Sequence, residues 1–495
     1  ILKRREVLWF SVLNLLLKAA EKNRKLPEEL DLHIANGNSL INDEKLLGTK
    51  AFKWEGEFQE GTFDIVIGNP PYVRQEELAQ IKPALEKYKI YNGQNDLYAY
   101  FFEKGINLLR EGGLFGFIVS SKFIKTNYGK DLREFILNNT KILQFIDFAD
   151  LPVFSEATTY PCIIILEKSS KVEKNKNNKI LVSKLNTLNF SSLSKEIEKN
   201  SFYLKQSSLS ALPWNIVNET QSTIKDKIDK IGIPLTKFID EKLYRGVTTG
   251  CNEAFIIDEK IKNELIKKDS KSVEIIMKFL TGKDIKRYST NFNNLYLIYT
   301  YTGINLDNYP AVKEYLLNFK ANLNKVWEVK HSKHPWYELR GCSYYDKFQS
   351  PKIIYPRINI RPNFTFDENH YFTQDSSFII PSNSKYLIGV LNSKLMNYYA
   401  KQVCSLLRGG YYDYRYQYVE LFPIVKPNKI IEEKIISLVN EILEANKKLN
   451  QFGDKNTVET TKLKEEIKKS DERIDQEVYK LYKITDKEKE IIENS

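Results

Sequence analysis

A run of apolar residues that ends in Asn-Pro-Pro-Tyr constrains this chain more than any other feature. The run 64–68 predicts a buried strand, and Asn69-Pro70-Pro71-Tyr72 follows directly at its carboxyl end. In open α/β sheets, ligands bind at the carboxyl ends of the strands. Pro70 and Pro71 each fix φ and supply no backbone N–H, so carbonyl groups dominate this loop. The pattern therefore predicts a ligand site rich in hydrogen-bond acceptors.

These four residues suit the methylation of a planar amino group. The exocyclic amine of adenine is a poor nucleophile because its lone pair is delocalised into the ring. The side-chain carbonyl of Asn69 and the backbone carbonyl of Pro70 would accept from that NH2 and favour sp3-like geometry as attack begins. Tyr72 offers a flat face on which a flipped base would stack. A proline-rich turn without a ligand is the alternative.

Three segments carry a family resemblance: DIVIGNPPYVRQE at 64–76, Asp96-Leu97-Tyr98, and GGLFGFIVSSKFI at 112–124. They resemble the amino-methyltransferases that use S-adenosylmethionine. More closely, they resemble the gamma-class N6-adenine DNA methyltransferases of fused type IIG restriction–modification enzymes. The resemblance covers almost the whole chain. It implies a site-specific, adenine-specific DNA methyltransferase that moves a methyl group directly from S-adenosylmethionine, its cofactor, to the exocyclic amino group of adenine.

The resemblance also implies which residues form the site. Phe154, in a loop after a strand, would be the second aromatic against the flipped base, so the catalytic residues would be Asn69, Pro70, Pro71, Tyr72 and Phe154. The motif 36–40 resembles the one that holds the adenine of the cofactor, although many relatives carry Asp in place of Asn38. An ordinary Asn-Gly turn is the alternative there. The residues expected to bind the cofactor are Asn38, Asn69, Asp96 and Tyr98.

Asp96 has two possible roles, because it either helps to bind the cofactor or caps a helix, for which Asp is also a good residue. The glycine-rich strand–turn and the ribose-pairing acid of the family are expected upstream of residue 1, so we expect this chain alone to bind the cofactor poorly. Type IIG relatives carry their nuclease in the same upstream region. The run 328–330, Glu-Val-Lys, has no partner acid in a strand and does not predict a nuclease.

The positive charge of the chain is concentrated in its middle. Residues 1–170 and 426–495 each carry a net charge of −1, whereas 171–425 carry +13, against +11 for the whole chain. A chain that is merely lysine-rich would spread its charge evenly. This concentration is the electrostatic pattern expected of a region that binds double-stranded DNA.

Alternating strands and helices predict an α/β fold, a partial Rossmann-like class I methyltransferase sheet that is mainly parallel with helices on both faces. It is followed by a mixed α+β DNA target-recognition domain and a C-terminal helical segment, an antiparallel hairpin. The expected domains are 1–215, 216–425 and 426–495. Expected elements in the first are helices at 1–23, 95–109 and 128–137 and strands at 32–35, 63–67, 114–119, 142–147 and, as the last, 162–166. The run 168–179 is expected to be an exposed turn or linker.

The middle region also contains segments that resemble landmarks of the family's recognition domain: 244–250, 279–288, 355–357 and 407–412. Each places Arg or Lys beside Gly turns and aromatic residues. That combination permits close backbone approach, phosphate pairing and bidentate guanine contacts. The residues expected to bind DNA are Arg245, Lys283, Arg287, Arg357, Arg361, Arg408, Tyr412 and Arg415.

The four cysteines lie far apart without a CxxC motif, which predicts reduced thiols rather than disulfides or zinc ligands. Cys162 begins an apolar strand and is expected to pack in the core rather than act as a nucleophile. No metal site is expected from His331 and His334. No apolar run approaches the length of a membrane span. We expect a cytoplasmic monomer of bacterial or archaeal type.

Two other functions remain open. The first alternative is a DNA-binding specificity module without activity in this truncated form. The second is an amino-methyltransferase that acts on a protein Gln amide or on RNA. Relatives of both kinds can use the same tetrapeptide. The charge of region 171–425 argues against the second alternative.

Overall fold

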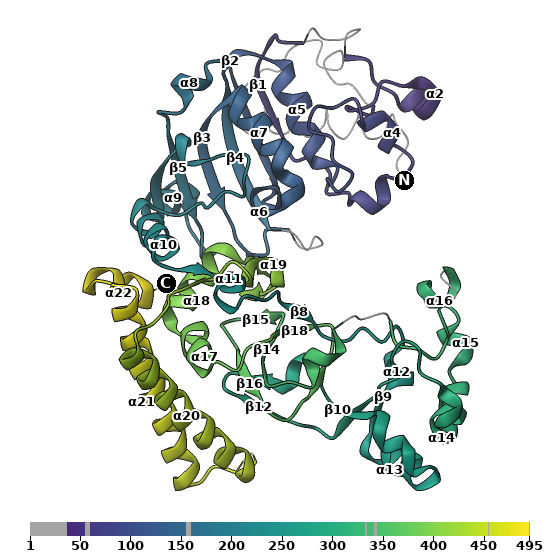
Figure 1. Cartoon of the computed structure of the whole chain (residues 1–495). Helices are drawn as coiled ribbons and strands as arrows, with labels where there is room; N and C mark the ends of the chain where they lie inside the picture. The colour runs from purple at the N-terminus through teal and green to yellow at the C-terminus, as the bar shows by residue number, and fades with distance from the viewer. Residues whose placement is uncertain are drawn as a thin grey trace. The chain divides into compact units, whose positions relative to one another are not determined.

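The computed structural model describes residues 37–54, 60–154, 160–331, 334–340, 344–453 and 455–494. They form two compact units, one that ends at Glu219 and one that begins at Thr220 (Figure 1). The helix expected over 1–23, the strand expected over 32–35 and Asn36 lie outside the described residues.

A six-stranded sheet forms the centre of the first unit. Its strands are β1 (Phe63–Gly68), β2 (Leu109–Ser120), β3 (Thr140–Asp147), β4 (Pro161–Lys168), β5 (Lys179–Lys184) and β6 (Ser201–Lys205). They lie in the order β1-β2-β4-β3-β5-β6. β1, β2, β3 and β5 run in one direction, and β4 and β6 run opposite to them. The expected α/β sheet is therefore confirmed, with two strands reversed.

Helices cover both faces of this sheet, but unequally. The helices of the unit are α2 (Glu44–Leu47), α4 (Lys82–Leu85), α5 (Tyr98–Leu108), α6 (Lys122–Lys125), α7 (Lys130–Asn139), α8 (Val172–Asn175) and α9 (Leu193–Lys199). α5 packs on β2 and α7 on β3, and the ring of Phe102 lies 5.2 Å from that of Phe115. Phe145 joins this core, whereas its neighbour Ile146 points to the opposite face and packs with Leu193 of α9.

β1 lies at the edge of the sheet among the described residues, so the expectation of a buried strand is wrong. Ile65 is 61% exposed and Ile67 is 84% exposed. Alternate side chains of a strand point to opposite faces, and Val66, on the other face from Ile65 and Ile67, reaches the core beneath α5, as does Phe63 at the start of the strand. The apolar run identifies the strand correctly but does not reveal which neighbours cover it.

The sheet also continues beyond the strand that the sequence predicts as the last. β5 and β6 extend it, and α8 lies within the run 168–179 that was expected to be a linker. Polar side chains hold these pieces to β3: Gln206 accepts from Ile142 N at 2.9 Å and donates to Thr140 O at 3.0 Å. β5 and β6 also pack Ile180, Val182 and Leu204 into the core, so the amide contacts add to apolar ones.

The second unit contains several small sheets instead of one large one. Among the described residues the larger ones are β17-β10-β13-β9, β16-β14-β18-β8 and β15-β20-β19, and pairs form between β11 and β12 and between β21 and β7. This arrangement agrees with the expected mixed α+β fold. The strands are β7 (Ile233–Pro234), β8 (Tyr244–Arg245), β9 (Ile256–Asp258), β10 (Ile276–Leu280), β11 (Ile285–Lys286), β12 (Ser289–Thr290), β13 (Leu295–Ile298), β14 (Lys352–Pro356), β15 (Ile358–Asn359), β16 (Thr365–Asp367), β17 (Phe372–Thr373), β18 (Ser377–Ile380), β19 (Ser405–Leu407), β20 (Tyr411–Asp413) and β21 (Pro423–Ile424).

Two 24-residue helices pack side by side at the C-terminal end, which confirms the expected helical hairpin (Figure 1). Neither they nor any other helix in the described ranges is long and apolar enough to cross a membrane. The helical hairpin of α20 and α21 packs on α17 and α18. The helices from residue 219 onward are α10 (Glu219–Ile231), α11 (Leu235–Ile239), α12 (Asn252–Phe255), α13 (Glu259–Lys268), α14 (Pro310–Leu317), α15 (Lys320–Leu323), α16 (Trp327–His331), α17 (Lys385–Asn392), α18 (Lys394–Val403), α19 (Tyr416–Val419), α20 (Lys429–Phe452), α21 (Val458–Leu481) and α22 (Asp486–Glu493).

An ionic cluster ties α21 to the rest of the second unit. Arg287 donates to both carboxylate oxygens of Asp471, at 2.5 and 2.7 Å, and to Asn392 O at 2.7 Å. One turn along α21, Asp475 accepts from Lys394 N at 2.8 Å and is only 2% exposed. Burial raises the pKa of Asp475 to about 6. The cluster therefore contains one carboxyl that the fold disfavours in its charged form.

We predict that Asp475→Asn stabilises the second unit at neutral pH. The raised pKa of Asp475 means that the folded protein holds a proton that the unfolded chain releases near pH 4. Stability from this group is therefore present at low pH and lost as pH rises through about 6. The amide keeps the acceptor for Lys394 N without the charge. The variant should gain up to about 3 kcal/mol at pH 8 and little at pH 4 in urea unfolding.

Asp226→Asn is the matched control, because Asp226 is exposed on α10 and its replacement removes the same charge without a burial effect. An Asp475→Asn variant that is less stable than the native protein at pH 8 would contradict the assignment. It would show that Arg287 and Lys394 outweigh the effect of burial.

Candidate functional site

The Asn-Pro-Pro-Tyr loop leaves the sheet at the carboxyl end of β1, as the sequence predicts. Gly68 ends the strand, and a Cβ there would lie 3.0 Å from the ring of Phe117, so a larger residue would crowd the core. Pro70 is buried while Asn69 is exposed. The Asn69 side chain makes no hydrogen bond within the described part of the chain. It is free to bind a ligand amine.

Tyr72 is held by its hydroxyl, which donates to Ile118 O of β2 at 3.2 Å. Burial, with a smaller contribution from Cys162, raises the pKa of Tyr72 to about 12. The hydroxyl therefore stays protonated at neutral pH and keeps donating to the carbonyl. It anchors the ring and does not serve as a general base.

Phe154 lies against Tyr72, as expected for two residues on either side of one ligand. The ring centroids are 5.5 Å apart and the planes are inclined by 57°. A base stacked flat between two rings needs about 7 Å, twice the optimal contact of about 3.5 Å. The pair therefore admits a base only if the rings separate, or if the base stacks on one ring and meets the edge of the other.

Asp96 does not cap α5, which contradicts one of its two readings. The N-cap position is Leu97, and no side chain caps the helix. Instead, Asp96 accepts from Gln75 N at 3.2 Å, and Leu97 N donates to Val73 O at 2.9 Å. These bonds fix the loop after Tyr72 to the start of α5. The residues 69–75 and 96–97 therefore form one connected site.

Tyr98, the next residue, is 2% exposed, and burial holds its pKa well above the ordinary value. A direct contact between Tyr98 and a cofactor stays a prediction. Tyr98 is the first residue of α5, and its side chain packs in the core of the first unit. Cys162 is also fully buried, and burial beside Asp147 raises the pKa of its thiol well above the usual range. A neutral, buried thiol agrees with the expectation that Cys162 is core packing rather than a nucleophile.

Asn38 forms a tight turn of its own. Its side-chain oxygen accepts from Leu40 N at 3.0 Å and from Ile41 N at 3.1 Å. The turn is held to the core because the Tyr88 hydroxyl donates to Leu40 O at 2.7 Å. This geometry fixes the amide plane of Asn38 and leaves its nitrogen available as a donor. The turn at Asn38 is therefore compatible with the cofactor-binding reading, while the Asn-Gly turn includes Asn36, outside the described residues.

The eight side chains expected to bind DNA fall into two groups. Five belong to ion pairs or to the hydrogen-bonded interior, and three are exposed and have no polar partner among the described residues. Arg245 pairs with Asp375 at 3.2 Å, and Arg287 pairs with Asp471. Tyr412, Arg357 and Arg415 lie on or beside β20. The three exposed side chains are Lys283, Arg361 and Arg408.

The small sheet β15-β20-β19 brings most of these residues together. Arg357 donates to both oxygens of Asp413, at 2.8 and 2.9 Å, and Arg415 reaches the same carboxylate at 3.0 Å. Arg408 lies in the turn between β19 and β20, where Gly409 and Gly410 both have positive φ. The buried carboxylate of Asp413 thus fixes two guanidinium groups beside an exposed turn.

Sequence reasoning missed the apolar part of this surface. Ile358 is 50% exposed and Ile360 is 56% exposed, and Arg361 follows them directly. Tyr411, 41% exposed, is on the neighbouring strand. The signal in the sequence is Ile-Asn-Ile-Arg, an alternation that reads equally well as a strand facing the core. We call Ile358, Ile360, Arg361, Arg408 and Tyr411 the hairpin surface.

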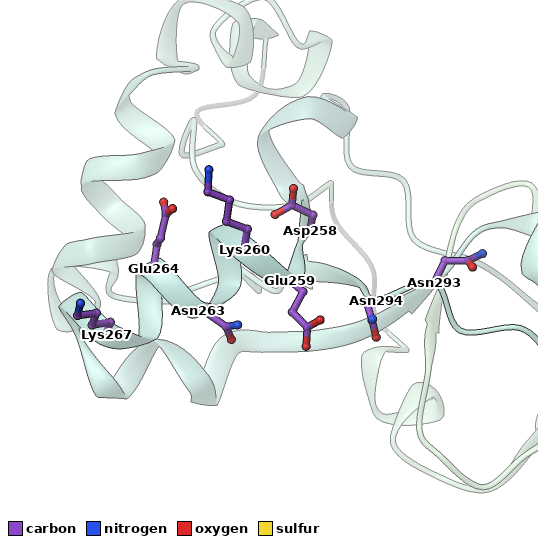
Figure 2. A pocket seen from close by; sticks show the side chains of 8 residues that line it. All are labelled: Asp258, Glu259, Lys260, Asn263, Glu264, Lys267, Asn293 and Asn294. Carbon is purple, nitrogen blue, oxygen red and sulfur yellow. The ribbon is translucent and has the colours of Figure 1, made fainter. Parts of the chain in front are cut away.

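A separate depression of about 700 Å3 lies along α13, and none of the residues predicted to bind DNA lines it (Figure 2). Three carboxylates and two lysines line it with three asparagines: Asp258, Glu259, Glu264, Lys260, Lys267, Asn263, Asn293 and Asn294. Its lining carries more acidic than basic groups, which disfavours a polyanion. None of the expected catalytic or cofactor-binding residues borders it.

Comparisons with known proteins distinguish a methylase region from a specificity region in this chain. Residues 4–154 match the Eco57I restriction-modification methylase family, and residues 277–424 match the TaqI-like C-terminal specificity domain. The type II methyltransferase M.BstVI of Geobacillus stearothermophilus is 24% identical over 430 residues, covering 82% of this chain and 74% of that protein. The type II restriction enzyme and methyltransferase RM.Eco57I of Escherichia coli is 26% identical, covering 79% of this chain but 43% of that protein.

Among solved structures, the type IIL restriction-modification enzyme MmeI aligns with a TM-score of 0.60 at 15% identity. The alignment covers 85% of this chain and 54% of MmeI, so the chain spans about half of that enzyme. This likeness supports the fold. The two family matches show that an Eco57I-type methylase region is followed in this chain by a TaqI-like specificity region.

Proposed function

We propose that this protein is a site-specific DNA methyltransferase that transfers a methyl group from S-adenosylmethionine to the exocyclic amine of adenine. The observation that carries this proposal is the exposed Asn69 side chain, free of hydrogen bonds to the described residues, at the carboxyl end of β1 and three residues from the Tyr72–Phe154 pair. An acceptor without an internal partner beside two aromatic rings suits an extrahelical base with an amino group.

In this proposal each residue of the loop has one task. Asn69 Oδ1 and the Pro70 carbonyl accept from the two hydrogens of the amino group and orient it for in-line attack. Tyr72 stacks on the base, and its bond to Ile118 O keeps the ring in position. Phe154 meets the base from the other side. Because the pKa of Tyr72 is raised, its hydroxyl does not take the proton that the amine loses.

The residues that would hold S-adenosylmethionine fit the group on the adenine side. The Asn38 amide, oriented by its turn, offers a donor to a ring nitrogen, and the Asp96–Gln75 contact fixes the neighbouring loop. When bound, S-adenosylmethionine supplies a methyl group on a sulfonium centre. The protein side of the reaction is therefore positioning: it holds the amine still and shields it from water.

The hairpin surface would meet the DNA together with Lys283. Arg361 and Arg408 have no internal partner among the described residues, whereas Arg357 and Arg415 are set by Asp413. Free, exposed guanidinium groups contact phosphates or guanine edges, while paired ones shape the surface beside them. The exposed Ile358 and Ile360 would contact thymine methyl groups or sugars.

We predict that Asn69→Ala lowers methyl transfer by about 100-fold or more, because the lost acceptor acts on the reacting amine. DNA affinity should stay within a few-fold, since Asn69 does not hold the duplex. The assay is transfer of radiolabelled methyl groups to DNA, with Asn177→Ala, an exposed asparagine in the same unit, as control. Tyr72→Ala should be milder, with a loss of roughly 1–3 kcal/mol of stacking, and Tyr72→Phe milder still. Normal turnover of Asn69→Ala would refute the assignment and favour a role in binding alone.

The free arginines of the hairpin surface should dominate its electrostatics. We predict that Arg361→Ala and Arg408→Ala each lower the slope of log K against log salt by about one. Arg473→Ala, on α21 and 60% exposed, is the control and should leave the slope unchanged. Arg287→Ala should instead lower stability, because it leaves Asp471 without its partner. If neither Arg361→Ala nor Arg408→Ala changed the slope, the hairpin surface would not touch phosphates.

Residues 216–425 should set the sequence that is methylated. We predict that replacing this whole segment by that of a relative transfers the relative's target sequence, because base contacts specify while the catalytic loop lies in residues 69–72. Sequencing of the methylated sites in DNA from cells expressing the hybrid checks this. An unchanged target would place recognition outside the segment.

A further inference from the structure

The helices α14, α15 and α16 form a projection of the second unit that the proposed function does not use; we call residues 306–331 the Trp327 arm. Figure 1 shows the three helices following one another at the side of the unit that carries α13. The inner side of the arm is fixed to the core through Val312, Leu316 and Leu323, each at most 1% exposed. These side chains anchor α14 and α15 to the core, and α16 follows them in the chain.

Trp327 stands on the outer side of the arm and is 66% exposed. Its ring stacks on His331, with centroids 5.0 Å apart and planes inclined by 25°. His331 Nδ1 donates to Trp327 O at 2.9 Å, because a carbonyl can only accept, so Nε2 carries the free lone pair. The backbone bond and the stacking fix both rings on the surface. A tryptophan held in this way contributes little buried area to folding and offers a flat apolar face.

Lysines lie close in sequence to this aromatic pair. Residues 320–331 contain three lysines and one glutamate. Lys325 and Lys330 are exposed and make no ion pair with any described residue, in contrast to Lys313, which pairs with Asp307. Lys320 lies over the ring of Trp336 at 5.3 Å. A flat aromatic surface flanked by free ammonium groups is complementary to a sugar–phosphate chain.

We propose that the Trp327 arm binds the sugar–phosphate backbone of duplex DNA, independently of base sequence and separately from the hairpin surface. Lys325 and Lys330 would neutralise phosphates, while the Trp327 ring would pack on a deoxyribose and its indole N–H would donate to a phosphate oxygen. Lysine carries a compact, strongly hydrated point charge, which suits a phosphate oxygen. The inference rests on the proposed function, because it requires that the protein binds DNA.

The test measures binding of the whole protein to a fluorescent 40-base-pair duplex of arbitrary sequence over a range of salt concentrations. Lys325→Glu with Lys330→Glu should weaken binding about tenfold near 0.15 M salt and lower the salt slope by about two. The control is Lys447→Glu with Lys448→Glu, which makes the same charge change at two exposed lysines of α20. An arm variant that matches the control in affinity and slope overturns the proposal.

A second measurement reports on Trp327 itself. In protein labelled with 5-fluorotryptophan, the Trp327 signal is identified by its loss in Trp327→Phe. It should shift when the duplex is added, while the signal of Trp214, which is 3% exposed in the first unit, stays in place. An unmoved Trp327 signal at saturating DNA overturns the contact. So does a change in self-association of Trp327→Ala at unchanged DNA affinity, which would assign the ring to a second copy of the chain.

These outcomes are distinct from failure of the proposed function. Loss of the arm contact with normal methyl transfer leaves the catalytic assignment intact. Native protein that transfers no methyl group to DNA, or that binds no duplex, removes the proposed function whatever the arm variants show.

Discussion

The parallel pairing of β1 with β2 is the interaction on which the candidate active site depends. It aligns Gly68 with Phe117, so the loop leaves β1 beside Ile118, whose carbonyl accepts from Tyr72. One residue of slip would turn every side chain of β1 to the other face and move Tyr72 away from that carbonyl. A Cβ at position 68 would lie 3.0 Å from the ring of Phe117, so a larger residue there would push that ring aside. Register, glycine and tyrosine anchor therefore act together to place Asn69.

The second unit depends on a different interaction, the pairing of arginine with aspartate. Asp413, Asp471 and Asp375 each hold at least one arginine of the basic middle region. The number of basic side chains in this region therefore overstates the number of cations available to a polyanion. Bidentate pairs are rigid and directional, so they shape the surface around the free arginines. Lys352 with Asp367, both fully buried, shows the same use of charge inside the sheet β16-β14-β18-β8.

Much of the fold could be predicted from the sequence, because periodicity and turn residues act locally. The strand before Asn69, the helix α7 and the helical hairpin are examples. The exposed Ile65 and Ile67 could not be predicted, since burial of a strand depends on which neighbours cover it and not on its own composition. β5 and β6 were not predicted, although Ile180, Val182 and Leu204 alternate as in strands that pack on a core; polar segments on either side of them read as loops.

The same reasoning explains the success and the failure at the candidate site. Asn69 and Tyr72 could be placed because one continuous motif carries them, and Phe154 because it follows a strand that ends nearby. The cap reading of Asp96 failed because a carboxylate binds whichever backbone N–H is left without a partner, and here that is the N–H of Gln75. The arginine pairs could not be foreseen, since Arg287 and Asp471 lie 184 residues apart.

The two asparagines of the first unit show how one residue type is given two chemical roles. The oxygen of Asn38 already accepts two backbone N–H groups, so only its nitrogen is left and the residue can act as a donor. Asn69 is preceded by glycine and followed by two prolines, whose nitrogens carry no hydrogen, so no nearby N–H of the loop binds its oxygen. It can therefore act as an acceptor. The backbone around each amide, rather than the amide itself, selects which half of the group remains for a ligand.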